Sequence, residues 1–325
     1  MRTFEYAAPV TVPEALSRAG GNAAYLAGGT TLVDLMKLDV VRPERVVDIN
    51  ALPLNGIEFD GRRLRIGALE RMSDVATHPA VATTYPVLRE ALLHSASPQL
   101  RNMASIGGNL LQRTRCGYFR DTATPCNKRE PGSGCPAQHG QNRGHAILGT
   151  SDSCVATHPS DACVALVALD ASVELAGPEG RRTLRLDDFY RLPGDTPHVE
   201  NELAPGELLA AVEVPHLPWL KNSAYVKVRD RAAFEFAVVS VAAALDLRDG
   251  VVADVRLAAG GVGTKPWRLT SVEEALRGRE LTEETADAAA ARSADGARPL
   301  AHNAFKIPLL RRTLTHVLLR LGGRS

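Results

Sequence analysis

Several features that mark other classes of protein are missing from this sequence. Its 38 lysines and arginines balance 37 aspartates and glutamates, with a formal net charge of +1. Because no polybasic run occurs either, no nucleic-acid-binding surface is expected. No uninterrupted apolar window of about 18 residues is present, so no membrane-spanning helix is expected. The N-terminal MRTFEYAAPVTVPEAL lacks the apolar core of a secretory signal, and we therefore expect the chain to fold in the cytoplasm.

Cysteine is absent from most of the chain. The five cysteines all lie between residues 116 and 163, and five is an odd number. Both facts argue against a disulfide scaffold spread across a secreted fold. Three of the five lie in RCGYFRDTATPCNKREPGSGCPAQHG (115–140), which has no hydrophobic period and is rich in proline and glycine. A long aperiodic loop of this kind inside a domain is usually functional or disordered.

The length of the chain predicts more than one domain, because 325 residues are too many to fold around one simple hydrophobic core. A parallel strand–helix–strand unit is expected over residues 23–49. The last third predicts antiparallel strands joined by an Asp249-Gly250 turn, followed by two helices. Strands are expected at 23–28, 45–49, 64–69, 172–176, 207–214, 224–228, 236–245 and 251–259. Helices are expected at 30–37, 86–96 and 159–171. One further helix is expected to begin at Thr282, and another to carry Ile307 to Leu321 on its apolar face. The predicted domains are 1–215, with subdomains 1–54 and 55–215 and an insert at about 112–154, and 216–325.

Two glycine pairs predict a phosphate-binding site. LAGGTTLVDLMK (26–37) places glycines between a strand and a helix, where the backbone can approach a ligand and free N–H groups point at it. SIGGNL (105–110) again places a glycine pair beside small polar donors. Neither fits G-x-G-x-x-G or G-x-x-x-x-G-K-[ST], so a nicotinamide-type site is disfavoured. Each motif taken alone is also compatible with a tight turn that holds no ligand.

Four cysteines predict a metal centre whose type the spacing leaves open. Cys116, Cys126, Cys135 and Cys154 supply the four thiolates of an iron–sulfur cluster, although their spacing is wider than in the ferredoxin run. Zinc usually takes closely spaced cysteine pairs, which are absent here, but His139 and His145 are available as nitrogen ligands. A disulfide would need an oxidising compartment and would leave one thiol unpaired.

The motifs together resemble those of a known family. AGGTTL, SIGGNL, HPSD (158–161) and YVKVRDRAAFEFAVVSVAAAL (225–245) are similar, in this order, to the FAD-binding subunit of molybdenum hydroxylases, which include xanthine dehydrogenases, carbon monoxide dehydrogenases and bacterial aldehyde oxidoreductases. The resemblance covers essentially the whole chain. It implies an α+β fold, with a vanillyl-alcohol-oxidase or PCMH-type FAD-binding domain of two α+β subdomains, followed by a small α+β domain.

The resemblance also implies roles for individual residues. Asp161 would hydrogen-bond an adenosine ribose hydroxyl, and Lys227 and Arg231 would lie nearer the isoalloxazine. The residues that would wrap the FAD pyrophosphate are Leu26, Ala27, Gly28, Gly29, Thr30, Thr31, Leu32 and Val33 from the first motif, and Ser105, Ile106, Gly107, Gly108 and Asn109 from the second.

Most members of the family lack the cysteine-rich insert. The insert resembles that of the aldehyde oxidoreductase whose FAD subunit also binds a [4Fe–4S] cluster, which implies that Cys116, Cys126, Cys135 and Cys154 are its ligands. Cys163 is expected to be a core thiol, because it lies two residues after Asp161 on a helix and so faces another way. The alternatives are a subunit similar to that of 4-hydroxybenzoyl-coenzyme A reductase, and a zinc-stabilised binding module whose glycine turns hold no ligand.

The implied function is electron transfer within a larger enzyme. No residue is expected to act as a general base. A [2Fe–2S] small subunit and a molybdenum-cofactor large subunit would complete a heterotrimer, and electrons would pass through FAD to an external acceptor. The closest-looking branch is exported as a folded complex on a partner's signal, which would give a periplasmic destination.

Overall fold

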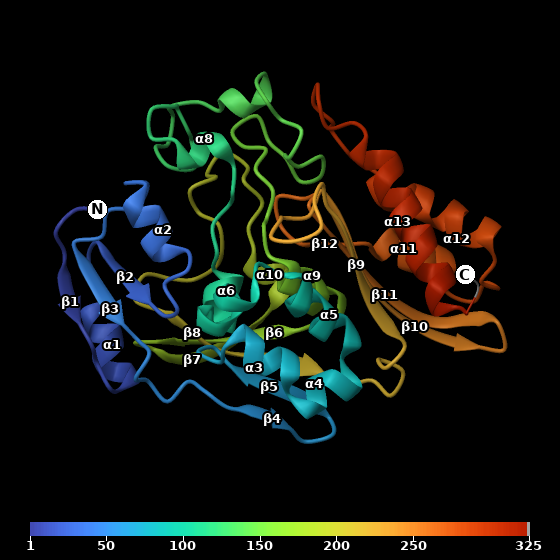
Figure 1. Cartoon of the computed structure of the whole chain (residues 1–325), viewed down its shortest axis with the longest axis horizontal. Helices are drawn as coiled ribbons and strands as arrows, with labels where there is room; N and C mark the ends of the chain where they lie inside the picture. Colours follow the sequence, from blue (N-terminus) through green and yellow to red (C-terminus); the bar gives the residue numbers. More distant parts are fainter. Residues whose placement is uncertain (324–325) are drawn as a thin grey trace.

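The computed structural model describes residues 1–323, which form three sheets with helices between and outside them (Figure 1). The first sheet is parallel, with strand order β1 (Glu5–Ala7), β3 (Arg45–Asp48), β2 (Ala23–Leu26). Helix α1 (Val12–Arg18) begins after Thr11, whose Oγ1 accepts the backbone N–H of Glu14 at 3.4 Å. Helix α2 (Leu32–Lys37) connects β2 to β3, so the predicted strand–helix–strand unit is confirmed.

The second sheet is antiparallel and supports a layer of short helices. Its strand order is β4 (Ile57–Phe59), β5 (Arg63–Gly67), β8 (Leu208–Pro215), β6 (Ser172–Gly177), β7 (Gly180–Arg185). The helices of this region are α3 (Met72–Thr77), α4 (Pro79–Thr84), α5 (Pro86–His94), α6 (Pro98–Met103), α7 (Ile106–Leu110), α9 (Asp161–Ala168) and α10 (Leu186–Phe189). Sequence patterning missed β7 because its GRRTLR segment is an exposed edge strand without apolar alternation.

The third sheet belongs to the C-terminal region. Its order is β12 (Trp267–Arg268), β11 (Val251–Gly260), β10 (Val239–Arg248), β9 (Ser223–Val228). The predicted hairpin turn is confirmed, with positive φ angles of 50° at Asp249 and 81° at Gly250. Helices α11 (Thr270–Leu276), α12 (Glu283–Ala290) and α13 (Lys306–Leu321) and the 3₁₀ turn η2 (Ala291–Ala294) share one apolar core with this sheet, while α5 and α9 contact it from the other side.

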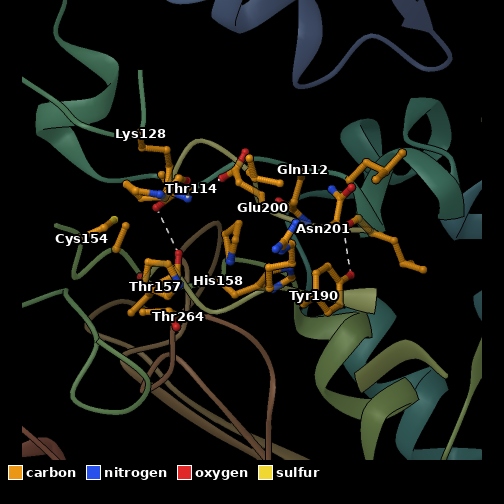
Figure 2. Close-up of a pocket in the computed structure, with 18 residues that line it drawn as sticks. Gln112, Thr114, Lys128, Cys154, Thr157, His158, Tyr190, Glu200, Asn201 and Thr264 are labelled. Atoms are coloured by element: carbon orange, nitrogen blue, oxygen red, sulfur yellow. Dashed lines mark hydrogen bonds and ion pairs between the residues drawn. The ribbon is translucent and has the colours of Figure 1, made fainter. Parts of the chain in front are cut away.

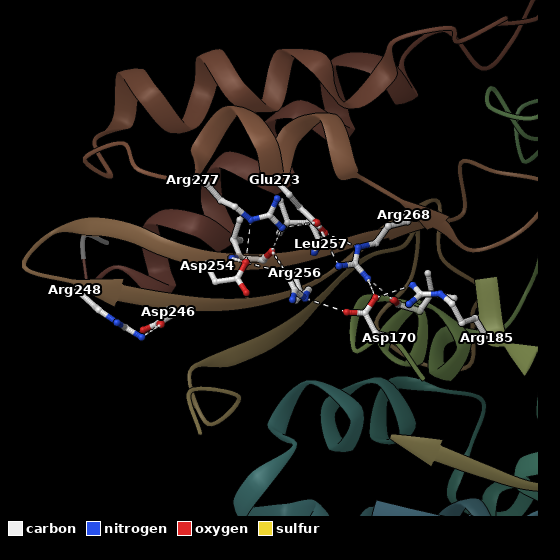
Figure 3. A network of polar contacts seen from close by, with 12 residues as sticks. Asp170, Arg185, Asp246, Arg248, Asp254, Arg256, Leu257, Arg268, Glu273 and Arg277 are labelled. Carbon is white, nitrogen blue, oxygen red and sulfur yellow. Dashed lines mark hydrogen bonds and ion pairs between the residues drawn. The ribbon is translucent and has the colours of Figure 1, made fainter. Parts of the chain in front are cut away.

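An ion network joins α9 to the C-terminal sheet (Figure 3). Asp170 follows α9, accepts a hydrogen bond from Arg268 Nη1 at 2.7 Å, and forms an ion pair with Arg256, whose Nε lies 3.0 Å from its carboxylate. Arg268 also donates to Glu273, a buried carboxylate of α11 that accepts the backbone N–H of Leu257 at 2.7 Å. These contacts hold the two larger sheets in a fixed relation, with a helical layer between them.

The predicted insert is an irregular segment at one end of the molecule, green in Figure 1. Its only helices within the described chain are α8 (Gly117–Arg120) and the 3₁₀ turn η1 (Pro136–Gln138). Side chains form hydrogen bonds with the backbone of the insert, where strands of a sheet would otherwise pair. For example, Asn127 Nδ2 donates to the Ser153 carbonyl at 3.0 Å. Because so many backbone groups of the loop are satisfied in this way, the insert is ordered although its sequence has no period. Within residues 1–323, every helix is too short or too polar to cross a membrane.

Candidate functional site

The first glycine motif forms the turn between β2 and α2. Gly29 has a φ of +72°, which a side chain would strain, and a Cβ on Gly28 would overlap the carbonyl oxygen of Met103. The turn is therefore pressed against the end of α6. Across residues 1–323, the backbone N–H groups of Gly28, Thr30 and Thr31 donate to no protein acceptor. They are free to bind a ligand.

The second glycine motif is a short helix rather than the turn that its sequence predicted. Ser105 caps α7 by accepting the backbone N–H of Gly108 at 3.1 Å. Gly107 packs on Ala68 and donates its N–H to the Ala68 carbonyl at 2.8 Å. A side chain at Gly107 would force the helix away from β5 and its following turn, which is why glycine is needed there.

The two motifs meet at one open pocket with a cavity volume of about 220 Å³. Of the predicted pyrophosphate residues, those lining it are Ala27, Gly28, Gly29, Thr30, Thr31, Leu32, Ser105, Gly107 and Gly108. We call this the glycine pocket. Leu26 and Val33 lie behind the turn, where their side chains pack against the Cβ position of Gly29, and Ile106 is buried in the core.

A second pocket with a cavity volume of about 60 Å³ continues from the first and shares Thr30, Thr31 and Gly108 with it. Asn109 and Asp161 line this second pocket. Asp161 is buried, and its carboxylate accepts from Tyr225 Oη at 2.6 Å, from Lys227 Nζ at 2.8 Å and from Ser95 Oγ at 3.2 Å. The structure thus places the predicted residues Asp161 and Lys227 in direct contact.

Arg231 lies apart from both pockets. It is exposed, and it pairs with Glu235 at 3.2 Å within the loop between β9 and β10. Sequence reasoning missed two other arginines, Arg113 and Arg115, which line the first and second pockets. Both lie just after the second glycine motif, and that position is the signal that would have indicated them.

The four predicted cysteine ligands line a third, smaller pocket, which we call the cysteine pocket. Cys116, Cys126, Cys135 and Cys154 surround it together with His145, whose Nε2 lies 3.2 Å from Cys116 Sγ. No three Cys, His, Asp or Glu side chains among residues 1–323 converge on a single metal-ion position. A [4Fe–4S] cluster does not require this, because each thiolate binds a different iron atom.

Burial governs the chemistry of these groups. It raises the pKa of the Cys116 thiol to about 11 and also raises the pKa values of Cys135 and Cys154. Burial lowers the pKa of His145 to about 4, so this imidazole is neutral at pH 7. A bound metal would therefore have to displace protons from the thiols.

Comparisons with known proteins agree with this arrangement. The family model for the FAD-binding domain in molybdopterin dehydrogenase matches residues 2–217, and the model for the CO dehydrogenase flavoprotein C-terminal domain matches residues 223–321. The chain belongs to the FAD-binding subunits of the molybdopterin dehydrogenases. The fold predicted for this family, a PCMH-type FAD-binding domain followed by a small α+β domain, is confirmed.

Individual relatives of this FAD-binding subunit match over most of its length. It is 49% identical to the aldehyde oxidoreductase FAD-binding subunit PaoB of Escherichia coli, over all of both chains. It is 30% identical to the carbon monoxide dehydrogenase medium chain of Hydrogenophaga pseudoflava, over 88% of this chain and 84% of the relative. The solved structure of carbon monoxide dehydrogenase from that organism, lacking the Mo-pyranopterin moiety of its cofactor, matches with a TM-score of 0.77 and 27% identity, over 100% and 99% of the two chains.

FAD fits the residues of the glycine pocket. Two glycine motifs turn backbone toward one cavity, and the free N–H groups of the first are the donors that a diphosphate needs. The rest of that lining is mostly apolar, including Tyr25, Leu69 and Leu208, which suits the buried parts of a flavin nucleotide. In an FAD-binding subunit the chain itself supplies position and electrostatics, while the flavin supplies the redox chemistry.

Proposed function

We propose that this chain is the electron-transfer subunit of a molybdenum-dependent aldehyde oxidoreductase, carrying one [4Fe–4S] cluster in addition to FAD. The observation that carries the proposal is the meeting of four thiols at one pocket beside the glycine pocket. The aldehyde assignment is supported by 49% identity over the whole chain to an aldehyde oxidoreductase FAD-binding subunit. The thiols come from an insert that supplies no other metal-ligating group to this pocket except His145.

Roles for the chain's own residues follow from their positions. The free N–H groups of Gly28, Thr30 and Thr31 would bind the diphosphate of FAD, with Ser105, Gly107, Gly108 and Asn109 closing the other side. Asp161 would bind a ribose hydroxyl only in addition to its three protein donors. Lys227 would act through Asp161, because its side chain is 1% exposed. Arg231 would approach the isoalloxazine only if its loop moved inward.

We further propose that the chain assembles with a [2Fe–2S] subunit and a molybdenum-cofactor subunit and delivers electrons to an external acceptor. The name "medium chain" of its carbon monoxide dehydrogenase relative supports such a heterotrimer. We also propose a boundary between the two domains at residues 215 and 216. The two family matches separate a few residues later, between residues 217 and 223.

The cofactors can be tested directly. Protein purified without air should yield, on acid extraction, about one FAD and, by metal analysis, about four iron atoms per chain. Absence of flavin would overturn the assignment as a whole. Zinc in place of iron would overturn the cluster alone. With an aldehyde as substrate, the complex should reduce a dye and the isolated chain should not. Aldehyde-dependent dye reduction by the isolated chain would contradict the proposal that the aldehyde is oxidised on another subunit.

A further inference from the structure

The glycine pocket and the cysteine pocket share a wall. Leu35 of α2 lines the glycine pocket and packs in one apolar cluster with Phe119 and Cys126. Phe119 lines the cysteine pocket, and the guanidinium of Arg113 lies 4.6 Å from the centre of its ring. Arg113 itself lines the glycine pocket. At this point side chains that line one pocket contact side chains that line the other.

A chain of ion pairs crosses that wall. Arg113 Nε donates to Glu200 Oε2 at 2.6 Å, and Lys128 Nζ donates to Glu200 Oε1 at 2.9 Å. Lys128 lines the cysteine pocket, and it lines with Glu200 and Cys154 the adjoining pocket drawn in Figure 2. Among residues 1–323, Glu200 is thus the one carboxylate that pairs with a cation at each of the two sites.

The network is partly shielded from water. The exposed side-chain fractions are 11% for Lys128 and 25% for both Glu200 and Arg113. Burial acts to raise the pKa of Glu200, but the charges of Lys128 and Arg113 outweigh it and lower the pKa. Glu200 is therefore ionised at neutral pH, and the three groups together carry one net positive charge.

Stability alone does not account for this arrangement. Desolvating charges costs about as much as their attraction returns, so apolar side chains would hold the same loops together equally well. The consequence specific to charge is electrostatic. A cluster held by four thiolates is anionic and gains a further negative charge on reduction, and the diphosphate of FAD is anionic as well.

We propose that Glu200 is a positioning residue shared by the two cofactor sites. It holds the Lys128 ammonium beside the cysteine pocket, where positive charge favours the reduced state of the cluster. It holds the Arg113 guanidinium at the glycine pocket, where positive charge favours bound FAD. This inference rests on the proposed function, because it requires both groups to bind where the chain offers their ligands. Lys128 belongs to the insert, so the arrangement is confined to chains that carry it.

Three variants of the anaerobically purified complex separate the two effects. In Lys128→Met the reduction potential of the cluster, followed by electron paramagnetic resonance during a reductive titration, should fall by about 59 mV, which is tenfold in the reduction equilibrium. FAD retention should not change. In Arg113→Met the FAD dissociation constant, measured by flavin fluorescence, should rise about tenfold at an unchanged cluster potential. Glu200→Gln should produce both changes at once.

Controls distinguish charge from folding. Lys128→Arg should restore the potential, because it returns a cation to the same position. Glu213 has a side chain about as exposed as that of Glu200, at 22%, and pairs with Arg63 on the second sheet. In Glu213→Gln, the cluster potential and the FAD dissociation constant should therefore stay at the wild-type values. If Lys128→Met loses iron, Lys128→Gln, which keeps a polar stem, is titrated in its place.

Failure of this inference about Glu200 can be distinguished from failure of the proposed function. A wild-type complex without iron or flavin would overturn the function, and the inference with it. A wild-type complex that holds both, with a potential unmoved by loss of the Lys128 charge, would overturn the inference alone. A higher potential in Glu200→Gln would mean that Lys128 stays in place without its carboxylate, and would contradict the positioning role.

Discussion

Cys154 and Cys163 are close in the sequence, yet the fold gives them different surroundings. Cys154 lies in the returning segment of the insert and lines the cysteine pocket. Cys163 lies in α9 within the main apolar core, where its Sγ is 3.0 Å from Tyr190 Oη, and burial raises its pKa to about 12. A thiol in that environment is a small apolar side chain rather than a ligand.

Substitution at these two positions should therefore have opposite effects. Cys154→Ser should lose or convert the electron paramagnetic resonance signal of the proposed cluster, because one of its four proposed thiolate ligands is removed. Cys163→Ala should keep about four iron atoms and cost roughly 1 kcal/mol in the free energy of unfolding, since only a small cavity forms. Iron analysis and urea unfolding measure the two effects. Loss of iron in Cys163→Ala with retention in Cys154→Ser would show that the ligand assignment is wrong.

Lys306 gives the fold a dependence on pH. This fully buried lysine donates to the carbonyl oxygens of His145, at 2.9 Å, and Gly261, at 2.6 Å, and burial lowers its pKa from 10.5 to about 7. Unfolding therefore takes up a proton between pH 7 and 10.5. Because the unfolded state binds more protons in this window, the free energy of unfolding rises with pH across it, and below pH 7 this contribution is constant.

We expect Lys306→Met to flatten that rise by up to about 1.4 kcal/mol per pH unit. The slope is obtained from urea unfolding at several pH values from 7 to 10, with Lys221→Met at an exposed position as the control. A slope equal to that of the wild type would mean that Lys306 is protonated in the folded protein throughout this range.

At the scale of the elements, the position of α2 and α7 depends on backbone contact. Gly28 allows the turn before α2 to lie against the Met103 carbonyl, and Gly107 allows α7 to lie against Ala68. Because both motifs approach neighbouring backbone so closely, a methyl group in either contact would separate the two sides of the glycine pocket.

Gly28→Ala should therefore weaken FAD binding. The added Cβ would overlap the Met103 carbonyl, and relieving it should cost about 1–3 kcal/mol, or roughly fivefold to 150-fold in the dissociation constant of FAD. Gly20→Ala, where a Cβ meets nothing within 4 Å, is the control and should retain the wild-type flavin content. Full flavin occupancy in Gly28→Ala would argue against FAD binding at this turn.

At the scale of the whole molecule, Asp170 connects the FAD-binding region to the C-terminal sheet. Its carboxylate pairs with Arg185 at 3.0 Å in addition to Arg256 and Arg268, so three guanidinium groups converge on one negative charge (Figure 3). Charge-assisted hydrogen bonds of this kind are stronger than neutral ones, and removal of the carboxylate leaves like charges facing one another.

Asp170→Asn should destabilise the junction by roughly 2 kcal/mol and separate the unfolding of the two regions in a calorimetric scan. Asp230→Asn breaks an ion pair with Arg143 in which both side chains are more than half exposed, and it should change stability by less than about 0.5 kcal/mol. A single unshifted transition in Asp170→Asn would show that apolar contacts alone hold the two regions together.

The sequence by itself was sufficient for features that depend on local chemistry. Alternating apolar residues and the Asp249-Gly250 turn predicted the hairpin of β10 and β11, and Thr282 predicted the start of α12, because hydrogen bonds between near neighbours decide these elements. The two glycine motifs and the four cysteines of the insert were also identified from the sequence, and their roles in binding stay predictions. The edge strand β7 was missed because its partner, not its pattern, makes it a strand.

Only the tertiary structure decided which distant residues meet. Nothing local indicates that Asp161 pairs with Lys227 across 66 positions, or that Glu200 pairs with both Arg113 and Lys128. Such contacts depend on how sheets and loops stack once apolar surface is buried, and charged side chains leave no period in the sequence to reveal their partners. The same physical reason explains why an insert with no periodicity is ordered: its hydrogen bonds run between side chains and backbone, and only the completed fold brings those groups together.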